Sequence, residues 1–190
     1  MAVERARPDL EGYKKGIWRE AFMQRYLAAN LHAKDKDVLD CPCGVGWGSS
    51  LLTSAKTVTG IDISAEAIEF AQTYYSSPRL FFEVGNMATL PYTNRFDYIV
   101  FLEGMEHVTK QEAIATLNSF NHALKPGGEL FLTVPVKEPL KNKNPYHLHK
   151  YSYDEAISII SPLFSKIKEE TSQISEDVHI LCYYGKKQTE

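Results

Sequence analysis

Two aspartates and an alternating run of glycines carry the first chemical signal in the sequence. A short apolar run ends at Asp40, and the glycines follow it as Gly44, Gly46 and Gly48. In α/β proteins, the turn between a strand and the next helix can hold a nucleotide-like ligand against bare backbone. Asp62 lies 22 residues beyond Asp40, near the spacing of an acid that accepts hydrogen bonds from a ribose diol. The pattern predicts a binding site for a nucleoside-containing ligand.

The glycine spacing disfavours two common ligands of this kind. A dinucleotide fingerprint, G-x-G-x-x-G, needs its third glycine at position 49, where this chain has Ser49. The sequence also lacks the G-x-x-x-x-G-K-[ST] run that binds nucleoside triphosphates. The predicted ligand is therefore a nucleoside of another type.

Three histidines are candidates for acid–base chemistry on a second reactant: His107, His147 and His149. Each could serve as a general base or contact a substrate, although the pair Glu106-His107 could simply cap a turn, and the later two could belong to ordinary loop packing. In an extended loop His147 and His149 would share a side and could bind a metal ion. Because no carboxylate is evidently placed with them, no resident metal is predicted.

Alternating β-rich and helical runs would position these residues. The expected strands are 37–41, 57–62, 79–84, 97–102 and 128–135, and the expected helices are 46–55, 64–76 and 109–124. Capping-box patterns at Thr109/Glu112 and Ser152/Glu155 begin two helices, and a turn at 125–128 precedes a strand. After a helix near 152–163, strand-like runs at 165–171 and 177–185 are too close for a helical crossover, so one should run antiparallel. The sequence predicts an α/β fold with a mostly parallel sheet and helices on both faces.

Composition narrows the functional class. A length of 190 residues with an apolar content of 44% suits a single globular domain of ordinary composition. The net charge of −3 gives no reason to expect nucleic acid as a partner. The odd number of cysteines, three, argues against a disulfide framework. No apolar run is long enough for a membrane span, and the N-terminus lacks the apolar core of a signal sequence. A cytoplasmic protein is therefore expected. A local basic run is typical of a solvated loop but could dock a macromolecule: Lys137, Lys141, Lys143 and Lys150.

Five segments in order resemble motifs of the class I S-adenosylmethionine-dependent methyltransferases. They are the strand and glycine turn 38–48, the acid-ended strand 58–64, the segment EVGNMATLP at 83–91, FDYIV with EHV at 96–108, and LKPGG at 124–128. The likeness implies a Rossmann-like fold with a seven-stranded sheet, a C-terminal antiparallel hairpin and S-adenosylmethionine as cofactor. The chain is expected to form one domain over 1–190. It would comprise an N-terminal helical cap (1–35), which could be a packing helix or a lid, a cofactor-binding core (36–136) and a substrate part (137–190).

The resemblance implies contacts for the methionine part of the cofactor. Backbone around Cys41, Gly44 and Gly46 would pass close to it, and Asp40 would lie near its ammonium group. Pro42 replaces the usual first glycine of the motif, so that position would contact the cofactor by shape and carbonyl, without an N–H donor.

The nucleoside would be held by four further residues. By resemblance, Asp62 would accept hydrogen bonds from the ribose hydroxyls, and Ile63 would line one face of the adenine. Asn86, where the family commonly has Asp, would meet the adenine amino group, and Met87 would offer its N–H to the ring. An amide oxygen still accepts from an amine, so the substitution should weaken binding only modestly.

The methyl group would lie near Leu102 and Glu103, which leave the fourth strand. An acceptor atom attacks this methyl in line, and the protein mainly aligns the reactants, so a base is needed only if the acceptor must lose a proton. The finer likeness is to small stand-alone bacterial or phage enzymes, including ubiquinone, menaquinone and saccharide methyltransferases. It predicts a small-molecule acceptor, a saccharide or phenol-like metabolite. The alternatives are methylation of protein or RNA, and a non-catalytic cofactor-binding or scaffold module.

Overall fold

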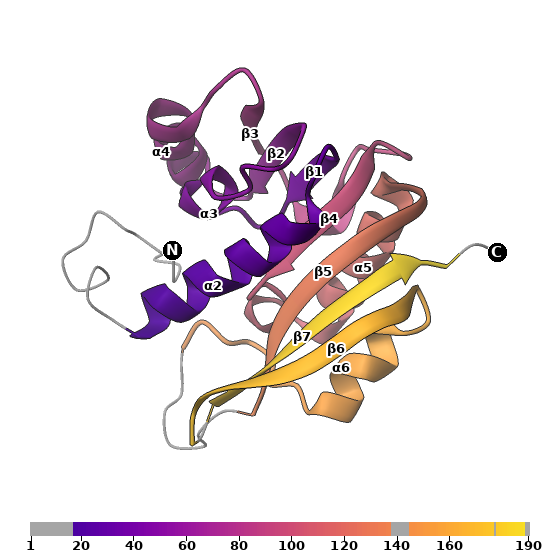
Figure 1. Cartoon of the computed structure of the whole chain (residues 1–190). Helices are drawn as coiled ribbons and strands as arrows, with labels where there is room; N and C mark the ends of the chain where they lie inside the picture. Colours follow the sequence, from indigo (N-terminus) through magenta and orange to yellow (C-terminus); the bar gives the residue numbers. More distant parts are fainter. Residues whose placement is uncertain (1–16, 138–144, 177, 189–190) are drawn as a thin grey trace. The chain divides into compact units, whose positions relative to one another are not determined.

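The structure of the chain is a computed structural model that describes residues 17–137, 145–176 and 178–188 (Figure 1). The backbone divides into two compact units, Met1–Met87 and Ala88–Glu190. The first 16 residues of the predicted N-terminal cap lie outside the described residues, as do Lys141 and Lys143 of the basic run. Within the described ranges, no helix is both long and apolar enough to cross a membrane.

The first unit is built on three parallel strands. Its elements are α2 (Ile17–His32), β1 (Asp37–Asp40), α3 (Trp47–Ser50), β2 (Thr57–Asp62), α4 (Ala65–Tyr75) and β3 (Leu80–Val84). The strand β1 pairs in parallel with β2, and β2 pairs in parallel with β3. Every residue of β2 after Thr57 is buried, as expected for a parallel strand covered on both faces. The short helix η1 (Met87–Thr89) begins at the end of this unit.

The second unit holds four strands that lie side by side in the order β4, β5, β7, β6 (Figure 1). Its elements are β4 (Phe96–Leu102), η2 (Met105–His107), α5 (Lys110–Ala123), β5 (Leu124–Lys137), α6 (Tyr153–Ile160), β6 (Phe164–Ser175) and β7 (Val178–Lys187). The strands β4 and β5 are parallel, whereas β7 runs antiparallel to both β5 and β6. The predicted antiparallel arrangement of the terminal strands is confirmed.

Three local predictions need correction. The helix expected over 46–55 spans only Trp47–Ser50, because the backbone beyond it closes tighter turns, with Leu51 N–H bonded to Gly48 O and Leu52 N–H to Ser49 O. The turn expected at 125–128 is part of β5, where it forms an irregularity in the pairing with β4. The capping box at Thr109 and Glu112 is complete, but the one predicted at Ser152 is only half formed.

Candidate functional site

Asp40 is the buried acid at the end of β1. Its carboxylate is fully inaccessible to solvent and accepts from Tyr26 Oη, at 3.2 and 3.1 Å from its two oxygens, and from Ser49 Oγ. Burial raises the pKa of Asp40 from 3.8 to about 7, although the hydrogen bonds from Ser49 and Tyr26 act in the opposite direction. The negative charge of nearby Asp62 raises this pKa further. Asp40 therefore changes charge near neutral pH.

The turn after β1 is joined to the end of β2. The Gly44 N–H donates to one oxygen of the Asp62 carboxylate at 3.0 Å, and the Ser64 N–H donates to the other at 2.9 Å. The Cys43 N–H donates to the Ile61 carbonyl at 2.8 Å. The hydrogen bond from Gly44 confirms the predicted placement of Asp62 beside the glycine turn. The two features meet because β1 and β2 are parallel and end at the same edge of the sheet.

The three glycines of the turn differ in what they face. A Cβ at Gly46 would lie 2.7 Å from the Phe82 ring, and one at Gly48 would lie 2.1 Å from the ring of Tyr26. A Cβ at Gly44 would meet no atom within 4 Å. Gly44 (φ +55°) and Gly46 (φ +81°) also adopt the left-handed conformation that favours glycine. Gly46 and Gly48 thus allow close internal packing, and Gly44 alone leaves an open side.

The helix α2 packs on this turn through aromatic rings. Phe22 stacks on Trp47 with ring centroids 6.0 Å apart and meets Tyr26 edge to face at 5.1 Å. The guanidinium of Arg19 lies 5.8 Å from the Trp47 ring centroid. The described part of the predicted N-terminal cap thus packs on the glycine turn through its aromatic side chains.

The other residues predicted to contact the cofactor lie at the ends of strands. In the first unit, Cys41 is buried in the turn, where burial raises the pKa of its thiol well above the usual value, and the peptide bond from Cys41 to Pro42 is cis. Ile63, directly after β2, is 69% exposed. Asn86 is also exposed, and Met87 opens η1.

Glu103 directly follows β4 and has a backbone conformation that is unusual for a residue other than glycine. Its φ of +50° lies in the left-handed region that favours glycine. The Glu103 N–H donates to the Thr133 carbonyl at 3.1 Å, and the Thr133 hydroxyl donates to the Glu103 carboxylate at 2.8 Å. Leu102, the last residue of β4, is buried. Strained backbone held in this way is common at functional sites.

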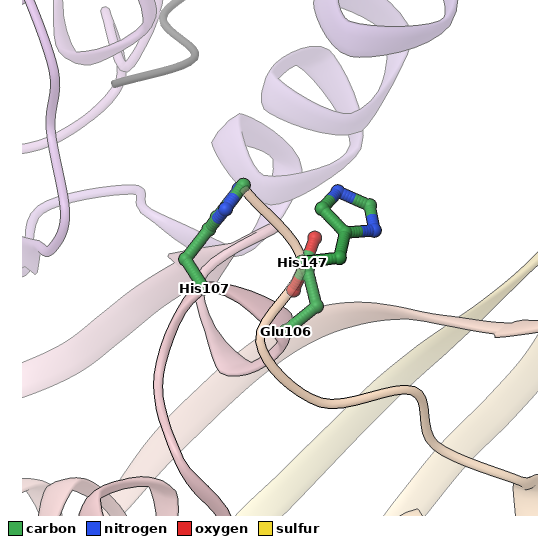
Figure 2. Close-up of side chains that lie close together, drawn as sticks. All are labelled: Glu106, His107 and His147. Atoms are coloured by element: carbon green, nitrogen blue, oxygen red, sulfur yellow. The ribbon is translucent and has the colours of Figure 1, made fainter. Parts of the chain in front are cut away.

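His107 and His147 lie together beside Glu106 (Figure 2). The helix η2 carries Glu106 and His107, and the loop after β5 carries His147. The two imidazole rings meet edge to face with centroids 5.0 Å apart. Backbone bonds hold the loop here, since the N–H groups of Leu148 and His149 donate to the Glu106 carbonyl at 2.7 and 3.2 Å.

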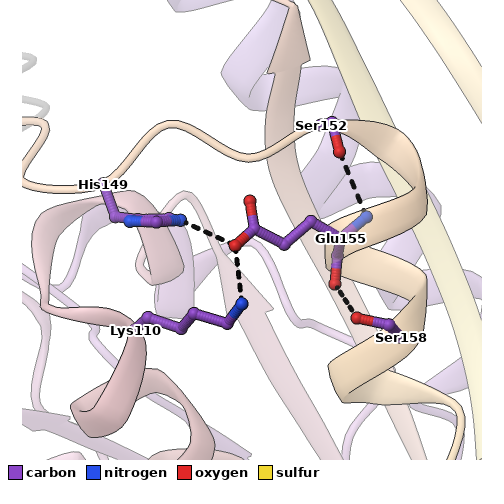
Figure 3. A network of polar contacts seen from close by, with 5 residues as sticks. All are labelled: Lys110, His149, Ser152, Glu155 and Ser158. Atoms are coloured by element: carbon purple, nitrogen blue, oxygen red, sulfur yellow. Dashed lines mark hydrogen bonds and ion pairs between the residues drawn. The ribbon is translucent and has the colours of Figure 1, made fainter.

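His149 belongs to a different group of polar side chains (Figure 3). Its Nε2 lies 3.1 Å from Oε1 of Glu155, which also accepts from Lys110 Nζ at 2.8 Å. These bonds explain the incomplete capping box, because the Glu155 side chain turns to Lys110 and His149 while its N–H donates to Ser152 Oγ. The Lys110 hydrogen bond is the main reason that the pKa of Glu155 is lowered.

The expectation that His147 and His149 share a side without a carboxylate is therefore wrong. Each has its own carboxylate neighbour, Glu106 for His147 and Glu155 for His149. Sequence reasoning also missed Tyr26 and Ser49 as partners of Asp40. The sequence held one signal for the Ser49 contact, because a serine stands at the position where a dinucleotide site has its third glycine.

Comparisons with known proteins agree on the type of domain. A family model described as a methyltransferase domain matches residues 38–128. The chain is 33% identical over 119 residues to the ubiquinone biosynthesis O-methyltransferase of Xanthomonas oryzae, a match that covers 60% of this chain and 49% of that protein. The chain thus spans about half the length of the first curated relatives that it matches.

Two solved structures share the fold. The N-methyltransferase NodS from Bradyrhizobium japonicum, in complex with S-adenosyl-L-homocysteine, aligns with a TM-score of 0.79 and 18% identity over 97% of this chain and 94% of that one. The 1,6-didemethyltoxoflavin-N1-methyltransferase of Burkholderia thailandensis aligns with a TM-score of 0.73 and 20% identity over 93% and 83%. The predicted fold class is confirmed: a mixed, mostly parallel seven-stranded sheet with helices and an antiparallel C-terminal hairpin.

The motif series, the matched family model and the shared fold lead to one family. The glycine turn and the acid that ends β2 lie together, as the motifs predict for a nucleoside-containing ligand, and the NodS structure holds S-adenosyl-L-homocysteine. Residues 38–128 thus match a methyltransferase domain, and together these comparisons support a class I methyltransferase that uses S-adenosylmethionine as cofactor.

Proposed function

We propose that this protein transfers the methyl group of S-adenosylmethionine to a small-molecule acceptor. The observation that carries the proposal is the hydrogen bond from the Gly44 N–H to the Asp62 carboxylate, 3.0 Å long. It joins the glycine turn to the acid that ends β2, the two features that the cofactor motif requires. Both belong to the first unit, which we assign to cofactor binding.

The methionine part of the cofactor is assigned to the turn and to Asp40. Ionised Asp40 would attract the ammonium group, directly or through water, and its pKa of about 7 makes that charge available at neutral pH. Gly44 offers an open side to the ligand, and Cys41, Pro42 and Gly46 shape the backbone around it. Pro42 contributes a carbonyl and no donor.

The ribose and the adenine are assigned to residues at the ends of β2 and β3 and directly after them. The Asp62 oxygens accept from the N–H groups of Gly44 and Ser64, and a carboxylate oxygen can accept more than one hydrogen bond, so this side chain suits the two ribose hydroxyls. Ile63 is a large apolar side chain that is 69% exposed, which suits a residue that lines an adenine face. Asn86 and Met87 keep the adenine contacts that the motif implies.

The second unit is assigned to the transferable methyl and the acceptor. Leu102 and Glu103 keep their implied role beside the sulfonium methyl. The candidates for acceptor contacts are His107, His147 and His149, which follow β4 and β5. The sulfonium is a good leaving group, so orientation of the acceptor and exclusion of water are the main demands on these residues.

A small acceptor is supported by the relatives. Their names refer to ubiquinone biosynthesis and to 1,6-didemethyltoxoflavin. The net charge of −3 gives no general attraction for nucleic acid. A saccharide or a phenol-like metabolite is the proposed substrate class.

Incubation with methyl-labelled S-adenosylmethionine tests the proposal. Separate reactions would contain phenolic metabolites, saccharides, total RNA and a peptide pool, and the label would be followed into each fraction. We expect label in a small molecule and at least tenfold less with Asp62→Ala. Label confined to RNA or peptides would overturn the substrate class, and the absence of label from every fraction would support a non-catalytic module.

A further inference from the structure

We propose that Glu106, His107 and His147 form a binding site for a divalent transition-metal ion in the second unit (Figure 2). Each residue offers one ligand atom, and the three atoms all lie within 4.8 Å of one another. Metal–nitrogen and metal–oxygen bonds of about 2.0–2.2 Å are reached from this arrangement by small side-chain rotations. The group joins residues 40 positions apart, so the fold, rather than local sequence, assembles it.

The carboxylate of Glu106 is suited to bind a cation. Glu106 is only 1% exposed, and both of its carboxylate oxygens are inaccessible to solvent, as is Nδ1 of His147. Attraction between a carboxylate and a metal ion is stronger in such surroundings than in water, because the local dielectric constant is low. Glu106 thus supplies the anionic ligand of the set.

His107 is oriented as metal-binding histidines commonly are. Its Nδ1 lies 3.1 Å from the carbonyl oxygen of Tyr146, which can only accept, so Nδ1 carries the proton. In the neutral ring, Nε2 then keeps the lone pair that a metal requires. A backbone carbonyl bonded to the other ring nitrogen is a common second partner for such a ligand.

The loop that carries His147 is fixed against the helix that carries the other two ligands. The N–H groups of Leu148 and His149 both donate to the Glu106 carbonyl. These hydrogen bonds place His147 beside η2. The two segments lie close together because they follow β4 and β5, which are parallel and end at the same edge of the sheet. Ligands on a held backbone lose less entropy on binding an ion than ligands on a free loop.

Two imidazoles and one carboxylate select the class of ion. This donor set suits Zn²⁺, Co²⁺, Mn²⁺ or Fe²⁺, whereas Mg²⁺ and Ca²⁺ favour sites made of oxygen alone. Three protein ligands leave at least one position for water or a substrate atom, as in catalytic metal sites. The proposed site is therefore open to a further oxygen ligand.

The open coordination position indicates which chemical class of acceptor the protein would methylate. This step rests on the methyl transfer proposed above. A hydroxyl oxygen bound to the ion has a lowered pKa and releases its proton to water. That oxygen forms a bond to the methyl carbon as the carbon–sulfur bond breaks, which leaves neutral S-adenosylhomocysteine. The acceptor would then be an alcohol or phenol whose oxygen can coordinate the ion.

Calorimetric titration of the full chain with Zn²⁺ and with Co²⁺ tests the site. We expect one equivalent to bind, and at least tenfold weaker binding by Glu106→Gln and by His147→Ala. His149→Ala is the matched control, because His149 lies two residues away in the same loop and pairs with Glu155; its metal affinity should equal that of the wild type. The Co²⁺ spectrum should lack the intense bands of thiolate ligation, which separates this site from the cysteines.

Several results would overturn the proposal. They are no saturable binding, thiolate bands in the Co²⁺ spectrum, equal affinity of His147→Ala and wild type, or equal losses in His147→Ala and His149→Ala. If Glu106→Gln fails to fold, His147→Ala and His147→Gln carry the test. Metal binding without methyl transfer would leave the site in place and count against the proposed function. Methyl transfer that persists with no metal bound would overturn the role of the ion in activating the acceptor and would leave the proposed function in place.

Discussion

The hydroxyl group of Tyr26 donates to both carboxylate oxygens of Asp40, at 3.2 and 3.1 Å. This contact joins α2 to the end of β1, and Tyr26 is itself 2% exposed. The hydrogen bond stabilises the ionised carboxylate against the effect of burial, which dominates its pKa. A residue on the N-terminal helix thus helps to set the charge of the acid that we assign to the cofactor ammonium.

Removal of this hydroxyl should weaken cofactor binding at neutral pH. Tyr26→Phe keeps the ring that packs against Phe22 but loses the donor, so the pKa of Asp40 should rise above about 7. We expect about tenfold weaker binding of S-adenosylhomocysteine at pH 7 and a smaller loss at pH 9, measured by calorimetry. Phe22→Leu, which alters the neighbouring ring without touching the carboxylate, is the control. An equal loss at both pH values would refute the electrostatic role of Tyr26.

Cofactor binding should itself depend on pH through Asp40. Below about pH 7 the acid is mostly protonated, and a ligand ammonium that binds the ionised form must displace the proton. The affinity for S-adenosylhomocysteine should rise close to tenfold per pH unit from 5.5 to 7 and level off above that. Asp40→Asn should bind weakly with a flat profile. A flat wild-type profile would show that Asp40 does not pair with the ammonium.

The same group makes the fold less stable as pH rises, the reverse of the usual behaviour of a carboxylate. Because the pKa of Asp40 is about 7 in the folded state and 3.8 in the reference state, the folded protein binds more protons between these values. Its contribution to the free energy of unfolding should fall between pH 4 and 7, by up to about 4 kcal/mol. Urea denaturation of the wild type and Asp40→Asn at pH 5 and pH 8 measures the effect. The advantage of the variant should grow at pH 8, and an equal difference at both pH values would contradict the assignment.

Two glycines of the turn should respond differently to an added methyl group. In Gly48→Ala the new Cβ would lie 2.1 Å from the Tyr26 ring, and the forced movement should cost about 1–3 kcal/mol in unfolding free energy. Gly44→Ala meets no neighbour and bears only the left-handed strain, roughly 1–2 kcal/mol, but it fills the side assigned to the cofactor. Melting curves with and without S-adenosylhomocysteine separate the effects. Ligand should stabilise Gly48→Ala more than Gly44→Ala, and the opposite order would be inconsistent with the assigned open side.

The sequence predicted the strands well because their apolar runs are continuous and bounded by polar or turn residues. β2 spans Thr57–Asp62 as expected, and the meeting of Asp62 with the glycine turn follows from parallel pairing. The helix after the turn was overestimated. Its apolar residues continue past Ser50, but Leu51 and Leu52 close tight turns instead of extending the helix.

The arrangement of the histidines could not be read from spacing. Alternation in an extended segment predicts that His147 and His149 share a side, but backbone bonds from Leu148 and His149 to the Glu106 carbonyl fix the loop. One histidine then lies beside Glu106 and the other beside Glu155. His107 and His147, 40 positions apart, meet because β4 and β5 end at the same edge of the sheet. A local sequence pattern carries no information about such a contact.

Titration of the full chain with S-adenosylhomocysteine, in parallel with Asp62→Ala and Asp62→Asn, tests the assigned cofactor site most directly. We predict saturable binding at one site per chain and at least tenfold weaker binding by Asp62→Ala, which loses both acceptor oxygens. Asp62→Asn keeps one oxygen acceptor and should fall between the two. No binding at millimolar ligand, or wild-type affinity in Asp62→Ala, would contradict the account.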